Sequence, residues 1–258
     1  MTNLFYLDIN PTLTKAVVLI HGLGANANSW QYQTPVLENA GYRVIVPDMR
    51  GFGQTNYAKG HQNTIESMAD DVYELMQKLG IKSAALVGLS MGGAIAMVFA
   101  LKYPQMATKL VLANTAARFA GKTGGWLYTL KRIIIMRFLP RRFGAKMVSN
   151  FIFPKPSQQE FRQEFMKEIL MADDRAYFDC VKTIIKHDIR DKIGAIAQPV
   201  LAIGGQFDLI TPPFQQRFLV DNIKGAKLVI IQGAGHVSSV DSAAEFNKEM
   251  LAFLGDSC

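Results

Sequence analysis

The chain of 258 residues is long enough for one large domain or two small ones with a sizeable buried core. Its 49 % apolar and 19 % charged residues exclude a disordered chain and a coiled coil. Two cysteines cannot form a disulfide framework, and four scattered histidines without cysteine pairs indicate no zinc module. We therefore expect no metal and no cofactor.

The net charge of +7 is concentrated in one segment. From Arg118 to Lys146 the sequence has eight Lys and Arg and neither Asp nor Glu, so the rest of the chain is nearly neutral. This is a local basic block, which would attract anions, and not a generally basic protein. Because the block contains no recognisable nucleic-acid-binding module, we do not expect nucleic acid as a partner.

The first ten residues lack the positive region and apolar run of a secretory signal, so we expect a cytoplasmic protein. Residues 84–101 carry no charge and approach the length of a membrane-spanning helix. The middle of this run, however, contains Gly88, Ser90, Gly92 and Gly93. A short strand, a glycine-rich turn and a buried helix explain it better, and we do not expect an integral membrane protein.

Short aliphatic or β-branched runs alternate with helical patterns along the chain. Each run is too short for a helix, and most lack the alternation of a strand with one exposed face. We therefore predict strands that are buried on both faces. The predicted strands are residues 16–20, 43–46, 84–87, 109–113, 200–203 and 228–231.

Helical patterns lie between these strands. Apolar residues repeat at i, i+3, i+4 and i+7 over residues 65–79. We predict that Asn63 and Glu66 form the capping box of this helix and that Gly80 ends it. The last helix is predicted to begin near Ser242. Strand–helix alternation of this kind predicts an α/β fold with a mostly parallel central sheet flanked by helices.

The alternation stops in the middle of the chain, where only helical patterns occur. An all-helical insertion between two core strands would lie over the carboxyl edge of the sheet, where ligands bind in such folds. We therefore predict a core of residues 1–114 and 199–258 and a helical cap, or lid, of residues 115–198. A separate carboxyl-terminal domain fits poorly, because strand patterns resume at Val200.

A G-x-S-x-G motif spans residues 88–92, with a predicted strand before it and a predicted helix after it. The glycines remove side chains that would collide in a strained turn, and the turn lifts the Ser90 Oγ above the sheet. A packing turn or a phosphate loop is the alternative, but the Walker lysine and the G-x-G-x-x-G pattern are absent. The motif in this context predicts that Ser90 is a nucleophile.

A serine hydroxyl needs a base to take its proton, and the base needs an orienting carboxylate. In this architecture the chain order should be serine, acid, histidine. Asp208 and His236 each follow a predicted core strand, at the edge where Ser90 is expected. The strand before Asn114 offers no competing carboxylate, and we interpret Asp241 as a cap of the last helix. Ser90, Asp208 and His236 are therefore the candidate catalytic residues.

The loop after the first predicted parallel strand reads HGLG at residues 21–24. The backbone amides of Leu23 and Met91 are the candidate oxyanion hole, the second of them at a helix start. We interpret His21 as a structural histidine that pins this loop. Residues 48–53 are expected to form a tied loop, in which the Asp and the Arg pair or bind backbone. His61 and His187 are interpreted as structural or surface residues.

As a set, these motifs resemble the α/β-hydrolase superfamily, and specifically its capped, serine esterase-like branch. They cover nearly the whole chain: HGLG at 21–24, DMRGFG at 48–53, GLSMGG at 88–93, GQFD at 205–208 and GAGH at 233–236. The resemblance implies a Ser90–His236–Asp208 triad with the Leu23 and Met91 amides as oxyanion hole. Serine at position 90 argues against haloalkane dehalogenase and epoxide hydrolase activity, which the family performs with aspartate. One departure is HVSSVD after the histidine, where many relatives carry a proline.

The expected activity is that of a carboxylesterase that hydrolyses a small-molecule ester through an acyl-enzyme on Ser90. Lactonase, C–C bond hydrolase and perhydrolase chemistry use the same triad, and a non-catalytic ligand-binding relative is a further alternative. Residues 126–142 interleave apolar residues with cations. This pattern is similar to lids of pimeloyl-acyl-carrier methyl esterases and suggests a medium acyl, anionic or carrier-linked ester, with an acidic carrier or anionic surface as partner. A helix with an apolar face on the cavity and solvated charges is the slightly favoured alternative.

Overall fold

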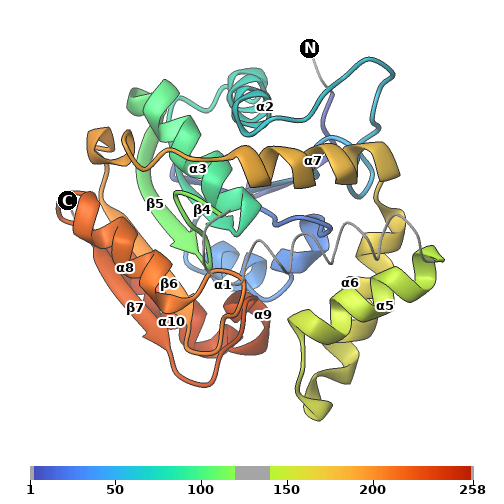
Figure 1. Cartoon of the computed structure of the whole chain (residues 1–258). Coiled ribbons are helices and arrows are strands. Elements are labelled where there is room, and N and C mark those ends of the chain that lie inside the picture. Colours follow the sequence, from blue (N-terminus) through green and yellow to red (C-terminus); the bar gives the residue numbers. More distant parts are fainter. Residues whose placement is uncertain (1–2, 120–139, 257–258) are drawn as a thin grey trace.

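The computed structural model describes residues 3–119 and 140–256. Its seven-stranded sheet has the order β1-β3-β2-β4-β5-β6-β7, and neighbouring strands are parallel except at β1, which is antiparallel to β3 (Figure 1). The strands are β1 (Tyr6–Ile9), β2 (Ala16–Ile20), β3 (Arg43–Pro47), β4 (Ala84–Leu89), β5 (Ala107–Ala113), β6 (Val200–Gly205) and β7 (Lys227–Ile231). The predicted α/β fold with a mostly parallel sheet is confirmed.

The six predicted strands all occur, with one or two residues added at an end of all but β2. The seventh, β1, was missed. It is a short edge strand without a buried aliphatic run, and its Asp8 forms an ion pair of 2.8 Å with Arg43 on β3. A strand that is held by an antiparallel partner and a charge pair has no signal of the kind that identifies strands buried on both faces.

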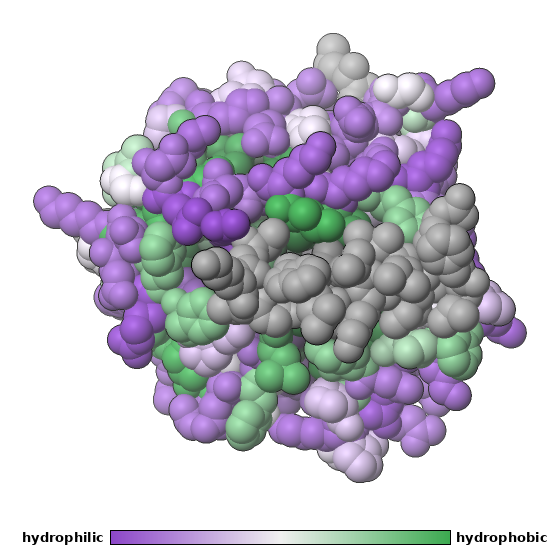
Figure 2. Space-filling view, in the orientation of Figure 1, coloured by the Kyte–Doolittle hydropathy of each residue, from purple (hydrophilic) through white to green (hydrophobic). Residues whose placement is uncertain are grey.

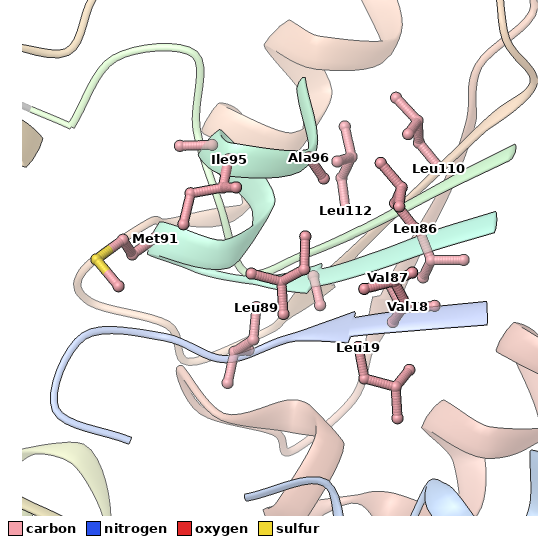
Figure 3. Packing of buried hydrophobic residues seen from close by; sticks show 14 of the residues in the cluster. Val18, Leu19, Leu86, Val87, Leu89, Met91, Ile95, Ala96, Leu110 and Leu112 are labelled. Atoms are coloured by element: carbon pink, nitrogen blue, oxygen red, sulfur yellow. The ribbon is translucent and has the colours of Figure 1, made fainter. Parts of the chain in front are cut away.

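Helices flank the sheet. They are α1 (Thr34–Asn39), α2 (Ile65–Lys78), α3 (Met91–Lys102), α8 (Pro213–Asn222), the short α9 (Ser238–Asp241) and α10 (Ala243–Gly255). α3 packs on β4 and β5, and α8 packs on β6 and β7. Figure 3 shows Ala96 of α3 beside Leu112 of β5, and both residues are buried. Burial of each leucine or isoleucine side chain contributes about 1.5–3 kcal/mol, so this contact holds the start of α3 firmly against the sheet.

The uncharged run 84–101 is accounted for by β4, a turn and the almost wholly buried α3. A helix that is apolar on all sides belongs in a protein core. Within residues 3–119 and 140–256, none of the helices combines the length and apolar character that crossing a membrane requires.

The start of α2 differs from the prediction by one residue. The Thr64 Oγ1 accepts the Ser67 N–H and the Ser67 Oγ accepts the Thr64 N–H, each at 3.0 Å, so the capping box is Thr64 and Ser67 and not Asn63 and Glu66. Asn63 is buried instead, and its side chain donates to the Arg50 carbonyl over 2.9 Å. The predicted stop is confirmed, because Gly80 follows the helix with a φ of 67°.

A helical insertion separates β5 from β6 in the chain, as predicted. Its described helices are α5 (Arg141–Ile152), α6 (Gln159–Met171) and α7 (Asp174–Lys186). α5 and α6 pack together to one side of the sheet, and α7 runs beside α2 (Figure 1). The division into a core of 1–114 and 199–258 and a cap of 115–198 stays a prediction. The apolar and basic pattern of 126–139 lies outside the described residues.

Surface hydrophobicity is uneven. Figure 2 shows hydrophilic side chains over much of the upper part of one face and several separate groups of hydrophobic side chains nearer its centre and in its lower half. Most of the large exposed apolar residues lie on α5, in the segment that joins β6 to α8, and at the start of α8. They are Phe143, Met147, Phe151, Phe207, Leu209 and Phe214. Because this segment follows the carboxyl end of β6, apolar surface extends to the edge of the sheet where the candidate site lies.

Candidate active site

Ser90 lies in the tight turn between β4 and α3. Its backbone has φ 53° and ψ −113°, a left-handed conformation that few residues other than glycine adopt without strain. A Cβ at Gly88 would approach the Gly92 carbonyl oxygen to 2.3 Å, and one at Gly92 would approach the Ile20 carbonyl oxygen to 2.0 Å. The motif glycines therefore allow the backbone to close around Ser90, which presents its hydroxyl at the carboxyl edge of the sheet.

The three residues predicted to act together are joined by hydrogen bonds. The Ser90 Oγ lies 3.1 Å from the His236 Nε2. The His236 Nδ1 lies 3.0 and 2.9 Å from the two carboxylate oxygens of Asp208. Asp208 and His236 are buried, whereas Ser90 is half-buried. The Nδ1 therefore carries the proton that Asp208 accepts, and the Nε2 lone pair faces the serine hydroxyl.

Asp208 is held by donors from its own loop and by Asn114, directly after β5. Its Oδ1 accepts the Ile210 and Thr211 N–H groups at 2.8 and 2.9 Å, and its Oδ2 accepts the Thr211 hydroxyl at 2.7 Å. Burial acts to raise the pKa of Asp208, but the charge of His236 and the hydrogen bonds from His236, Asn114 and Thr211 outweigh it and lower the pKa. The carboxylate is thus ionised and fixed in orientation.

Asn114 is a further part of this arrangement, although its sequence position was noted above only for lacking a carboxylate. It follows β5 with a φ of 44°, and its Nδ2 donates to the Asp208 Oδ2 at 3.0 Å and to the Gly235 carbonyl at 3.1 Å. Its Oδ1 accepts the Ser238 hydroxyl at 2.5 Å. Asn114 therefore links the acid to the histidine loop. An asparagine directly after a core strand, at the edge shared with Ser90, is the signal that could have identified it.

The interpretation of Asp241 as the cap of the last helix is wrong. Its Oδ2 accepts the Gly235 N–H at 2.8 Å, whereas Ser242 is the N-cap of α10 and makes no side-chain cap bond. Burial raises the pKa of Asp241, although the Gly235 N–H bond opposes this. Asp241 belongs to α9, a turn of helix before α10, so it reaches back to the histidine loop.

The HGLG loop lies directly against the nucleophile. A Cβ at Gly22 would lie 3.3 Å from the Leu89 carbonyl oxygen and 3.5 Å from the Ser90 Cβ. Leu23 lines the same cavity as Ser90, and Met91 is the first residue of α3, where backbone N–H groups have no partner within the helix. The role of the Leu23 and Met91 amides as an oxyanion hole stays a prediction.

His21 is buried and pins this loop, as predicted. Its Nε2 accepts the Met49 N–H at 3.0 Å, and its Nδ1 lies 2.8 Å from the Gly22 carbonyl oxygen, to which it donates. Burial is the main cause that lowers the pKa of His21, so the ring is neutral and both nitrogens are engaged. It is not available as a base for Ser90.

The loop of residues 48–53 is tied down, in a way that the prediction only partly described. Asp48 accepts the Ala27 and Gln54 N–H groups, each at 2.7 Å. Arg50 pairs with Asp71 of α2 at 2.6 Å and not with Asp48. The loop thus supports the His21 contact and contributes no side chain to the described lining of the active-site cavity.

A cavity of about 90 Å³ opens in front of Ser90. The core contributes Ser90, Leu23 and His236, and the helical insertion contributes residues from α5, α6 and α7, so the insertion covers the site. The described lining is mostly apolar; its members from the insertion are Phe119, Ile152, Phe153, Phe161, Glu164, Phe165, Glu168, Val181 and Ile184.

The chain belongs to the α/β-hydrolase fold family, whose model matches residues 15–243. It is similar to 3-oxoadipate enol-lactonase 2 of Acinetobacter baylyi, with 27 % identity over 93 % of this chain and 88 % of that protein. Two solved structures of relatives superpose closely: an enol-lactonase from Burkholderia xenovorans (TM-score 0.88, 27 % identity, 99 % of this chain and 97 % of that one) and an esterase from Exiguobacterium antarcticum (TM-score 0.90, 25 % identity, 99 % and 96 %). Fold and site together define a serine hydrolase with a Ser90–His236–Asp208 triad.

Proposed function

We propose that this serine hydrolase cleaves a carboxylic ester through an acyl-enzyme on Ser90. The observation that carries the proposal is the hydrogen bond of 3.1 Å between the Ser90 Oγ and the His236 Nε2, in a cavity with a mostly apolar described lining. A serine that faces a correctly oriented imidazole can act as a nucleophile at neutral pH.

The proposed reaction has two halves. The Ser90 Oγ attacks the ester carbonyl carbon while the His236 Nε2 takes the hydroxyl proton, and the same proton then passes to the departing alcohol oxygen as the ester bond breaks. Water next gives a proton to His236 and attacks the acyl-enzyme, and the proton returns to the Ser90 Oγ as the acid leaves. Asp208 keeps the imidazole tautomer and stabilises the imidazolium in both halves.

The negative charge that develops on the carbonyl oxygen needs donors. We propose that the Leu23 and Met91 N–H groups supply them. The contact of the Gly22 backbone with Ser90 and the position of Met91 at the start of α3 support this assignment.

A lactone is a cyclic ester and would follow the same steps. The two enol-lactonases among the relatives favour lactone hydrolysis as the second candidate activity. A comparison of matched open-chain esters and lactones decides between these two activities. The triad alone also fits C–C bond hydrolysis and perhydrolysis, which need assays with their own substrates.

The basic block leads to a further proposal, that an acidic carrier or anionic surface binds the helical insertion of this protein. We also propose that the protein is cytoplasmic. Arg142 and Lys146 are exposed on α5, which supports it, whereas Arg118 and Arg141 pair with Asp188 and Asp174 at 3.6 and 3.4 Å. The other four cations of the block lie outside the described residues. So does most of the segment that is similar to pimeloyl-acyl-carrier methyl esterase lids. A steep loss of kcat/KM with added salt for a carrier-linked ester, but not for a neutral one, would support a carrier partner.

Labelling with a fluorophosphonate, followed by turnover of p-nitrophenyl esters of increasing acyl length, tests the proposed function. We expect one adduct on Ser90 and a loss of about 10⁴ or more in kcat for Ser90→Ala. Ser29→Ala is the matched control, because Ser29 also lines the cavity but its hydroxyl donates to the Asn26 carbonyl at 2.8 Å. Wild-type turnover by Ser90→Ala would refute the proposal, and absence of an adduct would favour a non-catalytic binding protein.

A further inference from the structure

Two carboxylates from the helical insertion line the cavity in front of the catalytic serine. Glu164 and Glu168 lie four residues apart on α6 and therefore share one side of that helix. Of the described residues that line the cavity, they are the only acidic ones, and none of the described lining residues is Lys or Arg. Apart from the catalytic imidazole, the described ionisable side chains that a substrate meets beside Ser90 are therefore acidic.

The two glutamates differ in their partners. The Glu164 Oε2 accepts a hydrogen bond of 3.1 Å from the Gln31 Nε2, which carries no charge. Glu168 is half-buried and makes no hydrogen bond or ion pair with a residue of the described chain. Burial, followed by the charges of Glu164 and Asp48, raises the pKa of Glu168 to about 8. A positive group in the cavity would lower the pKa of Glu168 and favour its ionised form, whereas a carboxylate would raise this pKa further.

Aromatic rings lie beside these carboxyl groups. Phe161 and Phe165 precede Glu164 and Glu168 by three residues on α6, and both rings pack against Phe153, with centroids 5.7 and 6.1 Å away. All three rings line the cavity. Phenyl faces attract alkylammonium groups, and a combination of rings and carboxylates is the chemistry that recognises such cations. This is an observation independent of the acidic pair, and it indicates the same kind of ligand.

We propose that Glu168, with Glu164 and the neighbouring phenylalanines, selects esters that carry an alkylammonium group and rejects esters that carry a carboxylate. The inference rests on the proposed ester hydrolysis at Ser90, because one cavity holds both the nucleophile and the glutamates. It runs against the anionic ester suggested by the basic block.

Three p-nitrophenyl esters of similar size test the selection. The cationic ester is the 4-(trimethylammonio)butanoate, its neutral isostere is the 5,5-dimethylhexanoate, and the anionic one is the monoester of glutarate. For the wild-type protein we expect kcat/KM to be about tenfold higher for the cationic ester than for its isostere, and lowest for the anionic ester. In Glu168→Gln the ratio of cationic to neutral kcat/KM should fall about tenfold, and in Glu164→Gln by a smaller factor.

Glu160→Gln is the matched control. Glu160 lies one turn before Glu164 on α6 but is exposed and outside the described lining of the cavity, so the ratio should stay at its wild-type value. A wild-type ratio near one, a preference for the anionic ester, or an unchanged ratio in Glu168→Gln would overturn the inference while leaving the ester hydrolysis intact.

Failure of the proposed function is recognised separately, by the absence of both turnover and a fluorophosphonate adduct. In that case calorimetric titration of the wild-type protein and Glu168→Gln with hexyltrimethylammonium and with hexanoate measures the same charge preference without chemistry. If the wild-type protein binds the cation more tightly than hexanoate and Glu168→Gln loses this preference, the selection is supported. Equal or reversed binding by the wild-type protein would refute it.

Discussion

The carboxyl edge of the sheet and the cavity wall formed by α6 differ in how their polar groups are held. At the edge, Asp208 is engaged by backbone amides, Thr211, Asn114 and His236, all at 3.0 Å or less. On the wall, Glu168 has no described partner and stands beside another carboxyl group. The edge is built to keep reacting groups in one geometry, which the chemistry of acyl transfer requires. The wall keeps a carboxyl group without a described partner, which a cationic substrate can pair with.

The largest expected effect tests the edge. Asp208→Asn should lower kcat by about 10⁴, because an amide no longer holds the imidazole in the tautomer that accepts the Ser90 proton. The kcat for a neutral p-nitrophenyl ester measures this. Asp241→Asn is the comparison, since Asp241 holds the Gly235 N–H but does not contact the imidazole. A loss of similar size in both variants would mean that the whole loop, and not the Asp208 contact, controls activity.

A smaller effect is expected from Asn114, which positions the acid. Asn114→Ala should lower kcat by about 10–100-fold, because Asp208 and the Gly235 carbonyl lose a donor. Burial of Asp208 is opposed by the charge of His236 and by hydrogen bonds that include the one from Asn114. Removal of that bond therefore raises the pKa of Asp208. We expect the acid limb of the pH profile of kcat/KM to move to higher pH.

The backbone of Asn114 needs its own control, since a φ of 44° is strained for alanine. Asn114→Gly removes the side chain without that strain. If both variants shift the acid limb of the pH profile equally, the side chain is responsible. A shift in neither variant would show that Asn114 supports only the fold.

The smallest effect concerns the stability of the wall. Burial and the neighbouring carboxylates raise the pKa of Glu168 to about 8, from 4.5 for the free side chain. Between these values the unfolded chain releases a proton that the folded protein keeps, so the folded state loses stability as pH rises. Glu168→Gln removes this cost and should be more stable than the wild type at pH 8, on the order of 1 kcal/mol, but not at pH 4.5.

Thermal unfolding at both pH values measures this difference, with Glu160→Gln as the exposed control. A gain in stability together with a loss of selectivity for the cationic ester would show that the wall exchanges stability for recognition. Equal stability of the wild type and Glu168→Gln at pH 8 would contradict the burial of an unpaired carboxyl group.

The sequence predicted the edge far better than the wall, for a physical reason. Ser90 carries a local steric signature, and Asp208 and His236 follow strands whose burial on both faces is visible as apolar runs. Asn114 and the Asp241 contact were not predicted, because they depend on which loops meet across the sheet. The same holds for β1, which forms only against β3.

The wall illustrates the same limit. Phe161, Phe165 and Ile169 recur at helical spacing in the sequence and give α6 one apolar face. Glu164 and Glu168 lie at the border of that face, where charged residues are ordinarily solvated. Only the packing of α6 over the core turns this border toward Ser90. The helical periodicity of the sequence therefore could not predict that acidic side chains line the cavity.

The way the insertion is attached to the sheet has a consequence for how such enzymes diversify. It departs after Ala113 and rejoins at Val200, and β5 and β6, which carry these ends, are hydrogen-bonded neighbours. Lengthening or replacing the chain between them therefore alters no strand register, and a longer connection adds only about 0.6 kcal/mol of closure entropy for each doubling. Segments from relatives could be transplanted at this junction, giving new selectivity to an inherited catalytic frame.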